Sequence, residues 1–373
     1  MNRNKNKKIL ILSNHHSYTY NFRKEVIKRL LEEGYVVHIT LPYGEKVKLL
    51  EEMGCIYTES PLDRRGMNPV TDFKLIRSYY RLMRRIKPDV VLSYTIKPNI
   101  YGGLICRVLK IPFIANVTGL GTAVGNEGFL QKVLVALYKS AFNKAECIFF
   151  QNESNKAFFI DRGISLKKFK VIPGSGININ EFPYQEYPKD DDTLRFLFIG
   201  RIMKDKGIEE LIEAAKRIKE QNKNIQFDAL GFCEDEYKDK VDILQKKKII
   251  IFHGVKDNVG EYLENAHAVI HPTYHEGMSN VLLEAAATGR PVLASNIPGC
   301  KEIFDEGVSG FGFEPKNIDS LTQAIHKFVK LSNEERIMMG KAGRNKVERE
   351  FDRTIVVNAY LEEINRTLED QLI

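Results

Sequence analysis

The stretch AVIHPTYHEGMSNVLLEAAATGRPVLAS, residues 268–295, packs several elements of secondary structure into a short length of chain. Its pattern predicts an apolar strand over residues 268–274, a turn at Gly277 and a helix over residues 280–288, ended by Gly289 before the strand PVLAS. A helix between two strands in this way is typical of α/β folds with a parallel sheet. The amino end of the helix then lies where a ligand could bind.

Two carboxylates bracket the turn, Glu276 before it and Glu284 one turn into the helix. The backbone amides of residues 277–280 and the helix dipole would point at one place, which suits an anion such as a phosphate. Carboxylates beside an anion site would instead accept hydrogen bonds from hydroxyl groups. The pattern indicates a ligand that carries both phosphate and hydroxyls, as a sugar nucleotide does, although a pair of Glu at this spacing is also common on solvated helix faces.

Length and composition indicate a globular protein of two ordinary domains. The chain has 373 residues, of which 43% are hydrophobic and 10% aromatic, which excludes a mainly disordered protein. It contains neither a run of 18 apolar residues nor a recognisable signal peptide, so we expect a cytoplasmic protein. The five cysteines are scattered without a CxxC pair, and we expect buried thiols in a reducing compartment: Cys55, Cys106, Cys147, Cys233 and Cys300.

The net charge of +7 is unevenly distributed. Residues 1–180 contain 29 Lys and Arg and 14 Asp and Glu, a net charge of +15, whereas the remainder contains 27 and 35, a net charge of −8. A basic first half predicts an anionic partner for that half. Nucleic acid, a membrane surface and a phosphorylated substrate all fit this charge.

Short apolar segments alternate with helical segments in both halves. The first half has predicted helices near residues 21–33, 72–86, 130–144 and 154–162, and predicted strands at residues 8–13, 36–42, 55–60, 89–94, 111–117, 146–152 and 170–174. The second half repeats the pattern, with helices at residues 207–221 and 260–265 and strands at residues 194–200, 225–231 and 249–254. This alternation predicts two Rossmann-like, doubly wound domains.

The segment EFPYQEYPKDDDT, residues 181–193, interrupts the pattern with two prolines and three consecutive aspartates. We therefore expect an amino-terminal domain of residues 1–185 and a carboxy-terminal domain of residues 186–373. The last helix, about residues 353–372, is long and amphipathic and is expected to pack back on the first domain. Two such domains would bind ligands in a cleft at the carboxyl ends of their strands.

The strand at residues 194–200 runs into GRIMKDKG, with Arg201 directly after the strand and Lys206 before the next helix. Both cations are predicted at the sheet edge that also carries Glu276. A guanidinium and an ammonium group there would neutralise a diphosphate and stabilise it as a leaving group. Two solvated loop charges are the alternative, which the joint presence of both motifs disfavours.

GRIMKDKG followed by the E-x7-E motif EGMSNVLLE, on two Rossmann-like halves, resembles the family 4 retaining glycosyltransferases of the GT-B fold. The resemblance covers essentially the whole chain. The segments YNFRKEVIKRLLEEGYVVHITLP, VLSYTIKPNIYGGL and NVTGLGT are similar to the bacterial subgroup that extends lipid-linked oligosaccharides, including undecaprenyl-diphosphate-glycan N-acetylgalactosaminyltransferases and capsule or O-antigen enzymes.

The resemblance implies a function and a donor site. A hexose or N-acetylhexosamine would pass from a nucleotide sugar, expected to be a UDP-sugar, to a polyprenyl-diphosphate-linked glycan, with the departing phosphate helping to take the acceptor proton. Arg201, Lys206 and Glu276 are the implied catalytic residues. The implied donor-binding set consists of these three with Gly231, Val255, Gly277, Met278, Ser279, Asn280, Val281 and Glu284.

The first half departs from the family in two places. The loop after the first strand, SNHHSYTYNF, lacks the glycine pair of many members, and Thr118 stands where many carry a histidine. Thr118 can hydrogen-bond a sugar hydroxyl but cannot carry a proton near pH 7. We place the acceptor-side contacts at His15, His16, Tyr18, Lys97, Thr118 and Gly119.

Two helical segments of the first half combine basic and apolar residues. Residues 72–86 contain Arg77, Arg81, Arg84 and Arg85, and residues 129–144 mix lysines with Phe129 and several leucines. Such a surface suits an anionic bilayer, so we expect the protein to lie on the inner face of the plasma membrane.

We expect no metal and no cofactor, because the chain has no DxD motif and its clustered histidines, His267, His271 and His275, lie on a strand broken by Pro272. His271 is expected to be packed in the core and His275 to line the donor loop. The alternatives are an enzyme resembling UDP-N-acetylglucosamine epimerases and a non-catalytic protein that binds an anionic polymer. No nucleic acid is expected, since no basic stretch carries interleaved exposed aromatics.

Overall fold

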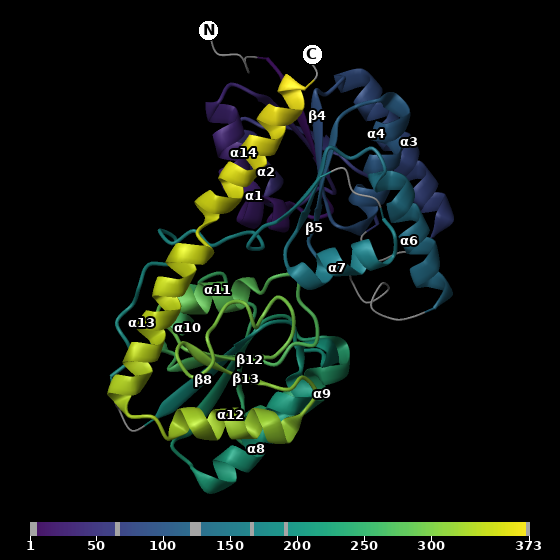
Figure 1. Ribbon diagram of the computed structural model, residues 1–373. Coiled ribbons are helices and arrows are strands. Elements are labelled where there is room, and N and C mark those ends of the chain that lie inside the picture. Colours follow the sequence, from purple (N-terminus) through teal and green to yellow (C-terminus); the bar gives the residue numbers. More distant parts are fainter. Residues whose placement is uncertain (1–5, 64–67, 120–127, 165–167, 190–192, 371–373) are drawn as a thin grey trace. The chain divides into compact units, whose positions relative to one another are not determined.

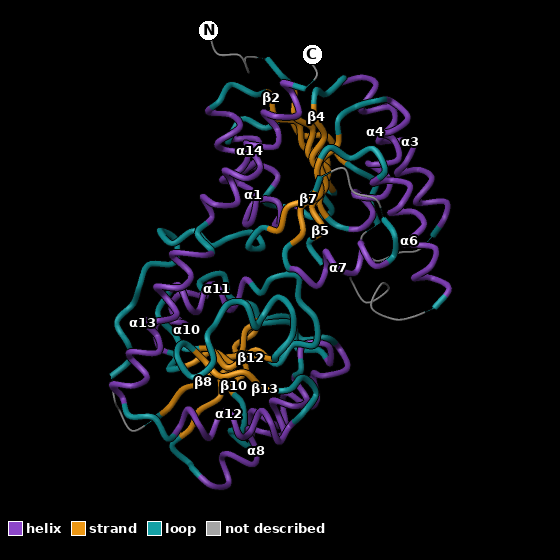
Figure 2. Tube along the Cα trace, viewed as in Figure 1, coloured by secondary structure: helices purple, strands orange, loops and turns teal. Residues whose placement is uncertain are grey.

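A computed structural model describes residues 6–63, 68–119, 128–164, 168–189 and 193–370. The chain forms two compact units, unit 1 from Met1–Ser175 with Arg353–Ile373 and unit 2 from Gly176–Asp352 (Figure 1). Helices and strands alternate along the chain in both units (Figure 2).

Among the described residues of unit 1, seven parallel strands form one sheet in the order β3-β2-β1-β4-β5-β6-β7. The strands are β1 (Lys8–Leu12), β2 (Val36–Leu41), β3 (Ile56–Glu59), β4 (Val90–Tyr94), β5 (Phe113–Val117), β6 (Cys147–Phe150) and β7 (Phe169–Val171). The helices are α1 (His16–Glu32), α2 (Val47–Glu52), α3 (Pro69–Ile86), the π-helical turn η1 (Pro98–Gly102), α4 (Gly103–Leu109), α6 (Phe129–Phe142), α7 (Glu153–Asp161) and α14 (Arg353–Glu369).

Helices cover both faces of the unit 1 sheet (Figure 1). Residues of α1 and α14 pack with Ile9 and Ile11 of β1 on one face, and residues of α3, α4 and α6 pack with Leu10 and Leu12 on the other. Consecutive β1 side chains point to opposite faces, so a strand covered on both faces must be apolar throughout. This requirement explains the continuous apolar run ILIL, residues 9–12.

Unit 2 has a six-stranded parallel sheet within the described residues, in the order β10-β9-β8-β11-β12-β13. The strands are β8 (Leu194–Ile199), β9 (Ile225–Leu230), β10 (Ile251–Gly254), β11 (Ala268–His271), β12 (Val292–Ser295) and β13 (Gly310–Phe313). The helices are the 3₁₀ turn η2 (Lys204–Lys206), α8 (Ile208–Gln221), the 3₁₀ turn η3 (Asp235–Tyr237), α9 (Lys238–Lys246), α10 (Val259–Asn265), α11 (Asn280–Ala287), α12 (Ile318–Val329) and α13 (Asn333–Glu350).

The order of the unit 2 strands is that of a Rossmann fold, with the first strand of the unit, β8, beside the fourth, β11. Residues of α8, α9 and α12 pack on one face of the sheet, and residues of α10 and α11 pack on the other. The prediction of two Rossmann-like, doubly wound sheets is confirmed.

The division between the units lies earlier in the chain than the expected one. It falls at Ser175 and Gly176 rather than after residue 185, because Ile177 packs in the unit 2 core and its amide hydrogen-bonds the Phe351 carbonyl at 2.8 Å. Residues 353–373, whose helix was expected to pack back on the first domain, belong to unit 1. Tyr360 and Ile364 of α14 are part of the unit 1 core.

Several predicted boundaries are wrong. β11 ends at His271 rather than residue 274, because Pro272 has no amide hydrogen for the ladder. α1 begins at His16, before the predicted residue 21, where the His15 ring accepts a hydrogen bond from the Ser17 amide and caps the helix. The sequence reading assigned no element to α2, α4, α9, β13, α12 or α13. Four cysteines are buried as expected, whereas Cys233 is only half-buried.

Candidate functional site

Two loops meet at the carboxyl edge of the unit 2 sheet, one after β8 and one after β11. These two strands are neighbours, but the chain continues from β8 to one side of the sheet and from β11 to the other. Such a reversal is the place where open α/β sheets bind ligands. GRIMKDKG follows β8 and PTYHEG follows β11, so both predicted motifs lie at this point.

The two loops are in direct contact. The amide of Tyr274 donates to the Asp205 carbonyl at 3.0 Å, and Gly207 lies against Pro272. Gly207 has φ of +69°, and a Cβ there would come within 1.9 Å of the Pro272 carbonyl oxygen, so only glycine fits. This contact places Lys206, directly before Gly207, beside the second loop.

Lys206 and Glu276 form an ion pair, with 2.5 Å between Nζ and Oε1. The ammonium group also lies 3.4 Å from the Thr273 hydroxyl, whose side chain is fully buried. The pair is partly shielded, with exposed side-chain fractions of 21% for Lys206 and 19% for Glu276. The structure therefore brings together two of the three residues expected to be catalytic.

His271 contacts the same Glu276 carboxylate from the core of unit 2. Its ring is buried, and Nε2 lies 3.2 Å from Glu276 Oε1. Burial lowers the pKa of His271, so the neutral ring donates a hydrogen bond. Burial also raises the pKa of Glu276, but the His271 hydrogen bond and the Lys206 charge outweigh it and hold this pKa at about 2. Glu276 is therefore an ionised acceptor at neutral pH and not a proton donor.

The turn before α11 is supported from behind by Gly299. The Ser279 amide donates to the Gly299 carbonyl at 2.8 Å, and a Cβ on Gly299 would meet the Gly277 carbonyl oxygen at 2.6 Å. Ser279 caps α11 by accepting from the Leu282 amide. Met278 is buried in the unit 2 core, so only its backbone remains for a ligand.

The remaining predicted donor residues lie on or near α11 and after the neighbouring strands. Asn280, Val281 and Glu284 are half-buried in the first turns of α11. Val255, after β10, is 67% exposed, and Gly231, after β9, has φ of +137°. A Cβ on Gly231 would lie 1.9 Å from the Gly200 carbonyl oxygen. Packing of the backbone therefore requires glycine at this position, whether or not a nucleobase binds there.

Arg201 is not part of the Lys206 and Glu276 cluster. Its side chain is 44% exposed and forms an ion pair with Glu234 of the loop after β9, with 3.4 Å between the atoms. Arg201 and Lys206, which were expected to converge, are paired with different carboxylates in this structure. An exposed pair of this kind is weak, and an anionic ligand could compete for the guanidinium group.

In unit 1, His15, His16 and Tyr18 form a stacked group at the amino end of α1. The rings of His15 and His16 lie 4.5 Å apart, and those of His15 and Tyr18 4.8 Å apart. Burial lowers the pKa of His16, whose Nδ1 lies 3.1 Å from the Ser17 hydroxyl. The group follows β1, which lies beside β4 at the point where this sheet also reverses direction.

The other predicted acceptor residues follow β4 and β5. Lys97 is engaged by Asp72, with 2.6 Å between the charged atoms, and Asp72 also accepts from the Tyr101 hydroxyl at 2.8 Å. Thr118 and Gly119 follow β5 and are half-buried, and Gly119 has φ of 151°.

Three buried polar atoms on the same edge of unit 1 have no hydrogen-bond partner among the described residues. They are Asn14 Oδ1 after β1, Thr95 Oγ1 after β4 and Asn116 Oδ1 near the end of β5. Thr95 also has φ of 74°, which is strained for a β-branched residue. Buried polar atoms are normally paired, so these three are exceptions within the described residues, and they lie near the ends of neighbouring strands.

The comparisons with known proteins agree with this arrangement. The model of glycosyl transferases group 1 matches residues 181–346, and the model of glycosyl transferase 4-like proteins matches residues 8–152. The chain belongs to the group 1 glycosyltransferases. Both matched segments lie within the two Rossmann-like units, and the prediction of a GT-B glycosyltransferase is confirmed.

Full-length relatives of this glycosyltransferase are known. It is 26% identical to N,N'-diacetylbacillosaminyl-diphospho-undecaprenol alpha-1,3-N-acetylgalactosaminyltransferase of Campylobacter jejuni, over 97% of this chain and 100% of the relative. It is 28% identical to the capsular polysaccharide biosynthesis glycosyltransferase CapM of Staphylococcus aureus, over 88% and 90%. Among solved structures, Anabaena HepE in complex with UDP superimposes with a TM-score of 0.77 at 17% identity, over 96% and 100% of the two chains, which shows the shared fold.

The glycosyltransferase site includes residues that the sequence reading did not select for a role at the site. His271, expected only to be packed, hydrogen-bonds Glu276, and Thr273 and Gly299 support the two loops. The segment SNIPGC after PVLAS was the available signal for Gly299, since Pro-Gly marks a turn at the next carboxyl edge. His275, expected to line the donor loop, is exposed. Within the described ranges, no group of three or more His, Cys, Asp or Glu is placed to hold a metal ion.

Proposed function

We propose that this glycosyltransferase moves a hexose or N-acetylhexosamine from a UDP-sugar, with retention of configuration, to a glycan on a polyprenyl diphosphate. The observation that carries the donor half is the Lys206 and Glu276 pair at the carboxyl edge of β8 and β11. The name of the Campylobacter relative, which acts on a diphospho-undecaprenol glycan, and the UDP bound to Anabaena HepE support the choice of substrates.

In this proposal Lys206 and Glu276 bind different parts of the donor, the diphosphate and the sugar. Lys206 neutralises the diphosphate and so stabilises it as a leaving group, with Arg201 as the second cation once it leaves Glu234. Ionised Glu276 accepts hydroxyls of the donor sugar, while the amides at the start of α11 face the phosphate. Glu284, one turn further, accepts from the ribose.

The departing phosphate, rather than a side chain, takes the acceptor proton. Glu276 is too acidic to exchange a proton near pH 7, since its pKa is about 2. Thr118 has no group that titrates there either. Charge stabilisation at the diphosphate is then the main demand on the protein, and the matched family favours transfer over epimerisation or simple polymer binding.

The acceptor belongs to unit 1 in this proposal. Asn14, Thr95 and Asn116 place buried oxygen atoms, without a partner among the described residues, near the carboxyl edge, and an acceptor hydroxyl that reached them could donate. His15, His16 and Tyr18 form one side of this edge, and Thr118 and Gly119 follow the neighbouring strand. Lys97 forms an ion pair with Asp72, and in this proposal an acceptor phosphate takes the place of that carboxylate when it binds.

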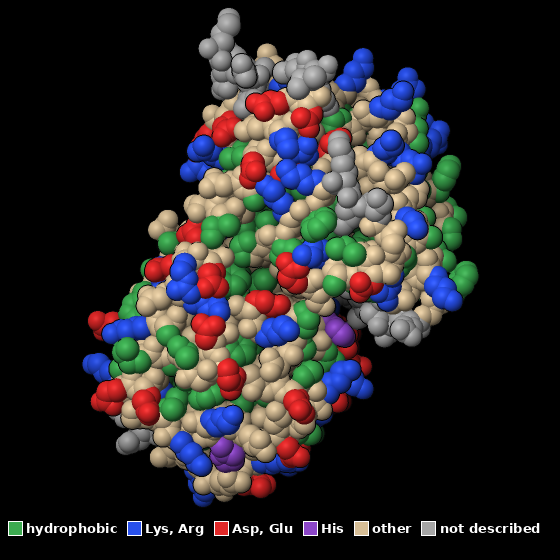
Figure 3. Space-filling view, viewed as in Figure 1, with side chains coloured by type: hydrophobic (Ala, Val, Ile, Leu, Met, Phe, Trp, Pro, Cys, Tyr) green, Lys and Arg blue, Asp and Glu red, His purple; other side chains and the backbone are tan. Residues whose placement is uncertain are grey.

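A lipid-linked acceptor requires access to a membrane surface. Within the described ranges, none of the helices combines the length and the apolar character needed to cross a bilayer. On unit 1, apolar side chains of α3, α4 and α6 are exposed, namely Val70 (63%), Phe73 (66%), Val108 (70%) and Phe129 (84%). Figure 3 shows Lys and Arg side chains interspersed with such hydrophobic groups over these helices. A basic and apolar surface of this kind supports binding to the cytoplasmic face of an anionic membrane.

The test is a screen of donors followed by an acceptor assay. A ligand that binds only the folded protein raises its melting temperature, so UDP-, GDP- and dTDP-sugars are compared in the presence of EDTA. A shift with one UDP-sugar and transfer of its sugar to a short-chain polyprenyl-diphosphate N-acetylglucosamine would support the proposal. No shift and no transfer with any UDP-sugar, when another nucleotide sugar gives both, would refute the donor assignment.

A further inference from the structure

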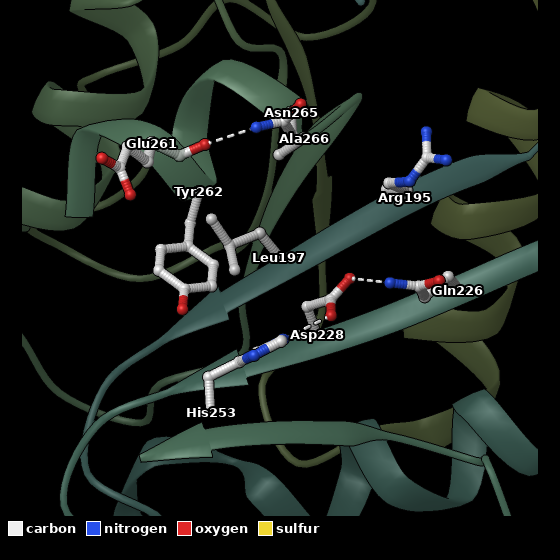
Figure 4. A pocket seen from close by; sticks show the side chains of 9 residues that line it. All are labelled: Arg195, Leu197, Gln226, Asp228, His253, Glu261, Tyr262, Asn265 and Ala266. Carbon is white, nitrogen blue, oxygen red and sulfur yellow. Dashed lines mark hydrogen bonds and ion pairs between the residues drawn. The ribbon is translucent and has the colours of Figure 1, made fainter. Parts of the chain in front are cut away.

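Unit 2 carries a second recess, on the face of its sheet rather than at the carboxyl edge. It has a volume of about 430 Å³ and lies between the strands β8, β9 and β10 and the helix α10 (Figure 4). This volume falls within the range of small-molecule sites in proteins. Its wall residues Arg195 and Gln226 stand near the amino ends of their strands, away from the edge that carries Lys206 and Glu276.

The polar character of this sheet face is unusual for a central parallel strand. β9 lies between β8 and β10, and its residues Ile225, Phe227 and Ala229 pack in the core on one face. On the other face the same strand presents Gln226 and Asp228. Parallel strands covered on both faces are normally apolar throughout, so polar residues here need another explanation. α10 is only seven residues long, and Gln226 and Asp228 line the recess beside it.

The side chains of the recess are held in place by one another. Asp228 is buried, and its two carboxylate oxygens accept from Gln226 Nε2 at 2.8 Å and contact His253 Nε2 at 2.6 Å. The Tyr262 ring stands edge-on to the His253 ring at 4.9 Å. Groups fixed in this way lose little conformational entropy when a ligand binds.

The charges of the recess select against strongly charged ligands. Among the described residues that line it, Arg195 is the only Lys or Arg, and two carboxylates, Asp228 and Glu261, also line it, so an anion such as a phosphate would be repelled. Asp228 already accepts hydrogen bonds on both oxygens, which weakens its attraction for a cation, and Arg195 opposes one. The preferred ligand is therefore neutral.

The hydrogen-bonding groups of the recess match hydroxyls. The Arg195 guanidinium carries several N–H donors, and the Asn265 amide has a second hydrogen besides the one that it donates to the Glu261 carbonyl at 2.8 Å. The Glu261 carboxylate accepts, and the Tyr262 hydroxyl does both. A hydroxyl group also does both, and a pyranose ring presents several hydroxyls around an apolar face that Leu197 could contact. We propose that this recess is a carbohydrate-binding site for a neutral sugar unit, separate from the donor site. Its link to a growing glycan rests on the proposed function, but sugar binding itself does not.

The test measures binding of neutral saccharides by saturation-transfer NMR and titration calorimetry. The probes are N-acetylglucosamine, N-acetylgalactosamine, galactose and N,N'-diacetylchitobiose. The matched variants lie one turn apart on α10: Glu261→Ala removes a group that lines the recess, and Glu264→Ala removes an exposed carboxylate that does not. We expect about tenfold weaker binding in the first and unchanged binding in the second.

Further variants separate the recess from the donor site. Asn265→Trp should close the recess and abolish saccharide binding while the melting temperature and the donor-induced shift are retained. Glu276→Ala should lose the donor-induced shift and keep saccharide binding. These two variants therefore test the sugar site in the recess and the donor site independently.

Three outcomes would overturn the proposal. One is that no probe binds the native protein at millimolar concentration. Another is that saccharide binding disappears in Glu276→Ala and persists in Asn265→Trp, which would place the sugar at the carboxyl edge. The third is that a lysine-rich peptide, but no saccharide, binds in a manner sensitive to Glu261→Ala, which would make the recess a docking site for protein.

Discussion

At the scale of single residues, the proposed donor site depends on one carboxylate kept ionised in a nearly buried position. Glu276 has a charge partner in Lys206 and a neutral hydrogen-bond donor in His271. Each supports it in a different way, because Lys206 can turn to a bound diphosphate whereas His271 is fixed in the core. These roles can be separated by substitution.

Lys206→Ala should reduce kcat/KM for transfer by about 100-fold or more, since it removes a charge that stabilises the leaving diphosphate. Lys204 lies in the same 3₁₀ turn but is exposed, and it provides the matched control. Lys204→Ala removes one positive charge, as Lys206→Ala does, and leaves the length of the turn unchanged. The measurement is steady-state transfer with the donor identified by thermal shift. Equal activity of the two variants would remove Lys206 from the proposed mechanism.

His271→Leu should move the acidic limb of the pH–rate profile to higher pH. In the native protein the pKa of Glu276 is about 2, below its ordinary value of 4.5, so its ionised form persists to low pH. Without the His271 hydrogen bond, burial raises this pKa and Glu276 is protonated at a higher pH. The exposed His275 is the control, and His275→Leu should leave the limb in place. Profiles of kcat/KM between pH 4 and 8 would decide between these outcomes.

At the scale of elements, Arg290 ties three segments of unit 2 together. Its guanidinium is fully buried and donates to the carbonyls of Leu263 and Glu264 in the last turn of α10 and to those of Gln185 and Glu186. Burial lowers the pKa of Arg290 to about 10, so the group remains charged at neutral pH. A cation at a helix carboxyl end is favourable, and here it also satisfies buried carbonyls.

Arg290→Met should therefore destabilise unit 2 by about 3 kcal/mol or more, because several buried carbonyls lose their donors together. Arg349→Met is a suitable control, since the Arg349 side chain is 67% exposed and pairs with the adjacent Glu350. Urea unfolding of both variants, followed by circular dichroism, measures the difference. A loss below about 1 kcal/mol would show that water replaces the guanidinium.

A second buried charge joins α14 to β7 in unit 1. The Glu363 side chain has no exposed surface and lies 2.8 to 2.9 Å from Lys168, Lys170 and Arg366. Burial raises the pKa of Glu363, but the three cations outweigh it and lower this pKa from 4.5 to about 2. A depressed pKa in the folded state means that the stabilisation is complete above pH 4.5 and is lost as the pH falls toward 2.

Glu363→Gln should cost about 3 kcal/mol at pH 7, because it removes the buried negative charge that Lys168, Lys170 and Arg366 share. The difference from the native protein should shrink between pH 4.5 and pH 2, where the native carboxyl also becomes neutral. Glu362→Gln is the comparison, since Glu362 is 67% exposed and pairs with Lys170. A difference that does not depend on pH would mean that Glu363 acts by packing rather than by charge.

The sequence predicted those parts of the fold and site that depend on local pattern. The alternation of apolar and helical segments was enough for the two sheets, and the motifs around Lys206 and Glu276 placed both at one edge. His271, Gly299 and Glu234 act through contacts between segments distant in sequence, which a pattern along the chain does not contain. Pro272 ended β11 early, because it has no amide hydrogen for the ladder. No element was predicted over residues 318–350, which form α12 and α13.

At the scale of the whole molecule, the path of the chain makes unit 1 discontinuous. The chain leaves this unit at Ser175, builds unit 2 and returns with α14, whose residues Val356, Tyr360 and Ile364 are almost completely buried in the unit 1 core. The Asn116 amide donates to the Tyr360 hydroxyl, so α14 also supports the β5 strand that precedes Thr118. Unit 2, by contrast, is formed from one continuous segment.

This asymmetry predicts different responses to removal of the last helix. A chain that ends at Asp352 should retain the cooperative unfolding of unit 2 and lose that of unit 1, since each large buried side chain lost costs about 3 to 5 kcal/mol and a domain is stable by only about 5 to 15. Calorimetry of the native and shortened chains measures this, and Tyr360→Phe is the mild control that removes one hydrogen bond and keeps the packing. The shortened chain should still show the donor-induced shift of unit 2, because Lys206, His271 and Glu276 are all in that unit. If both units unfold together, or if unit 1 keeps its transition without α14, the core contacts of this helix do not carry the stability assigned to them.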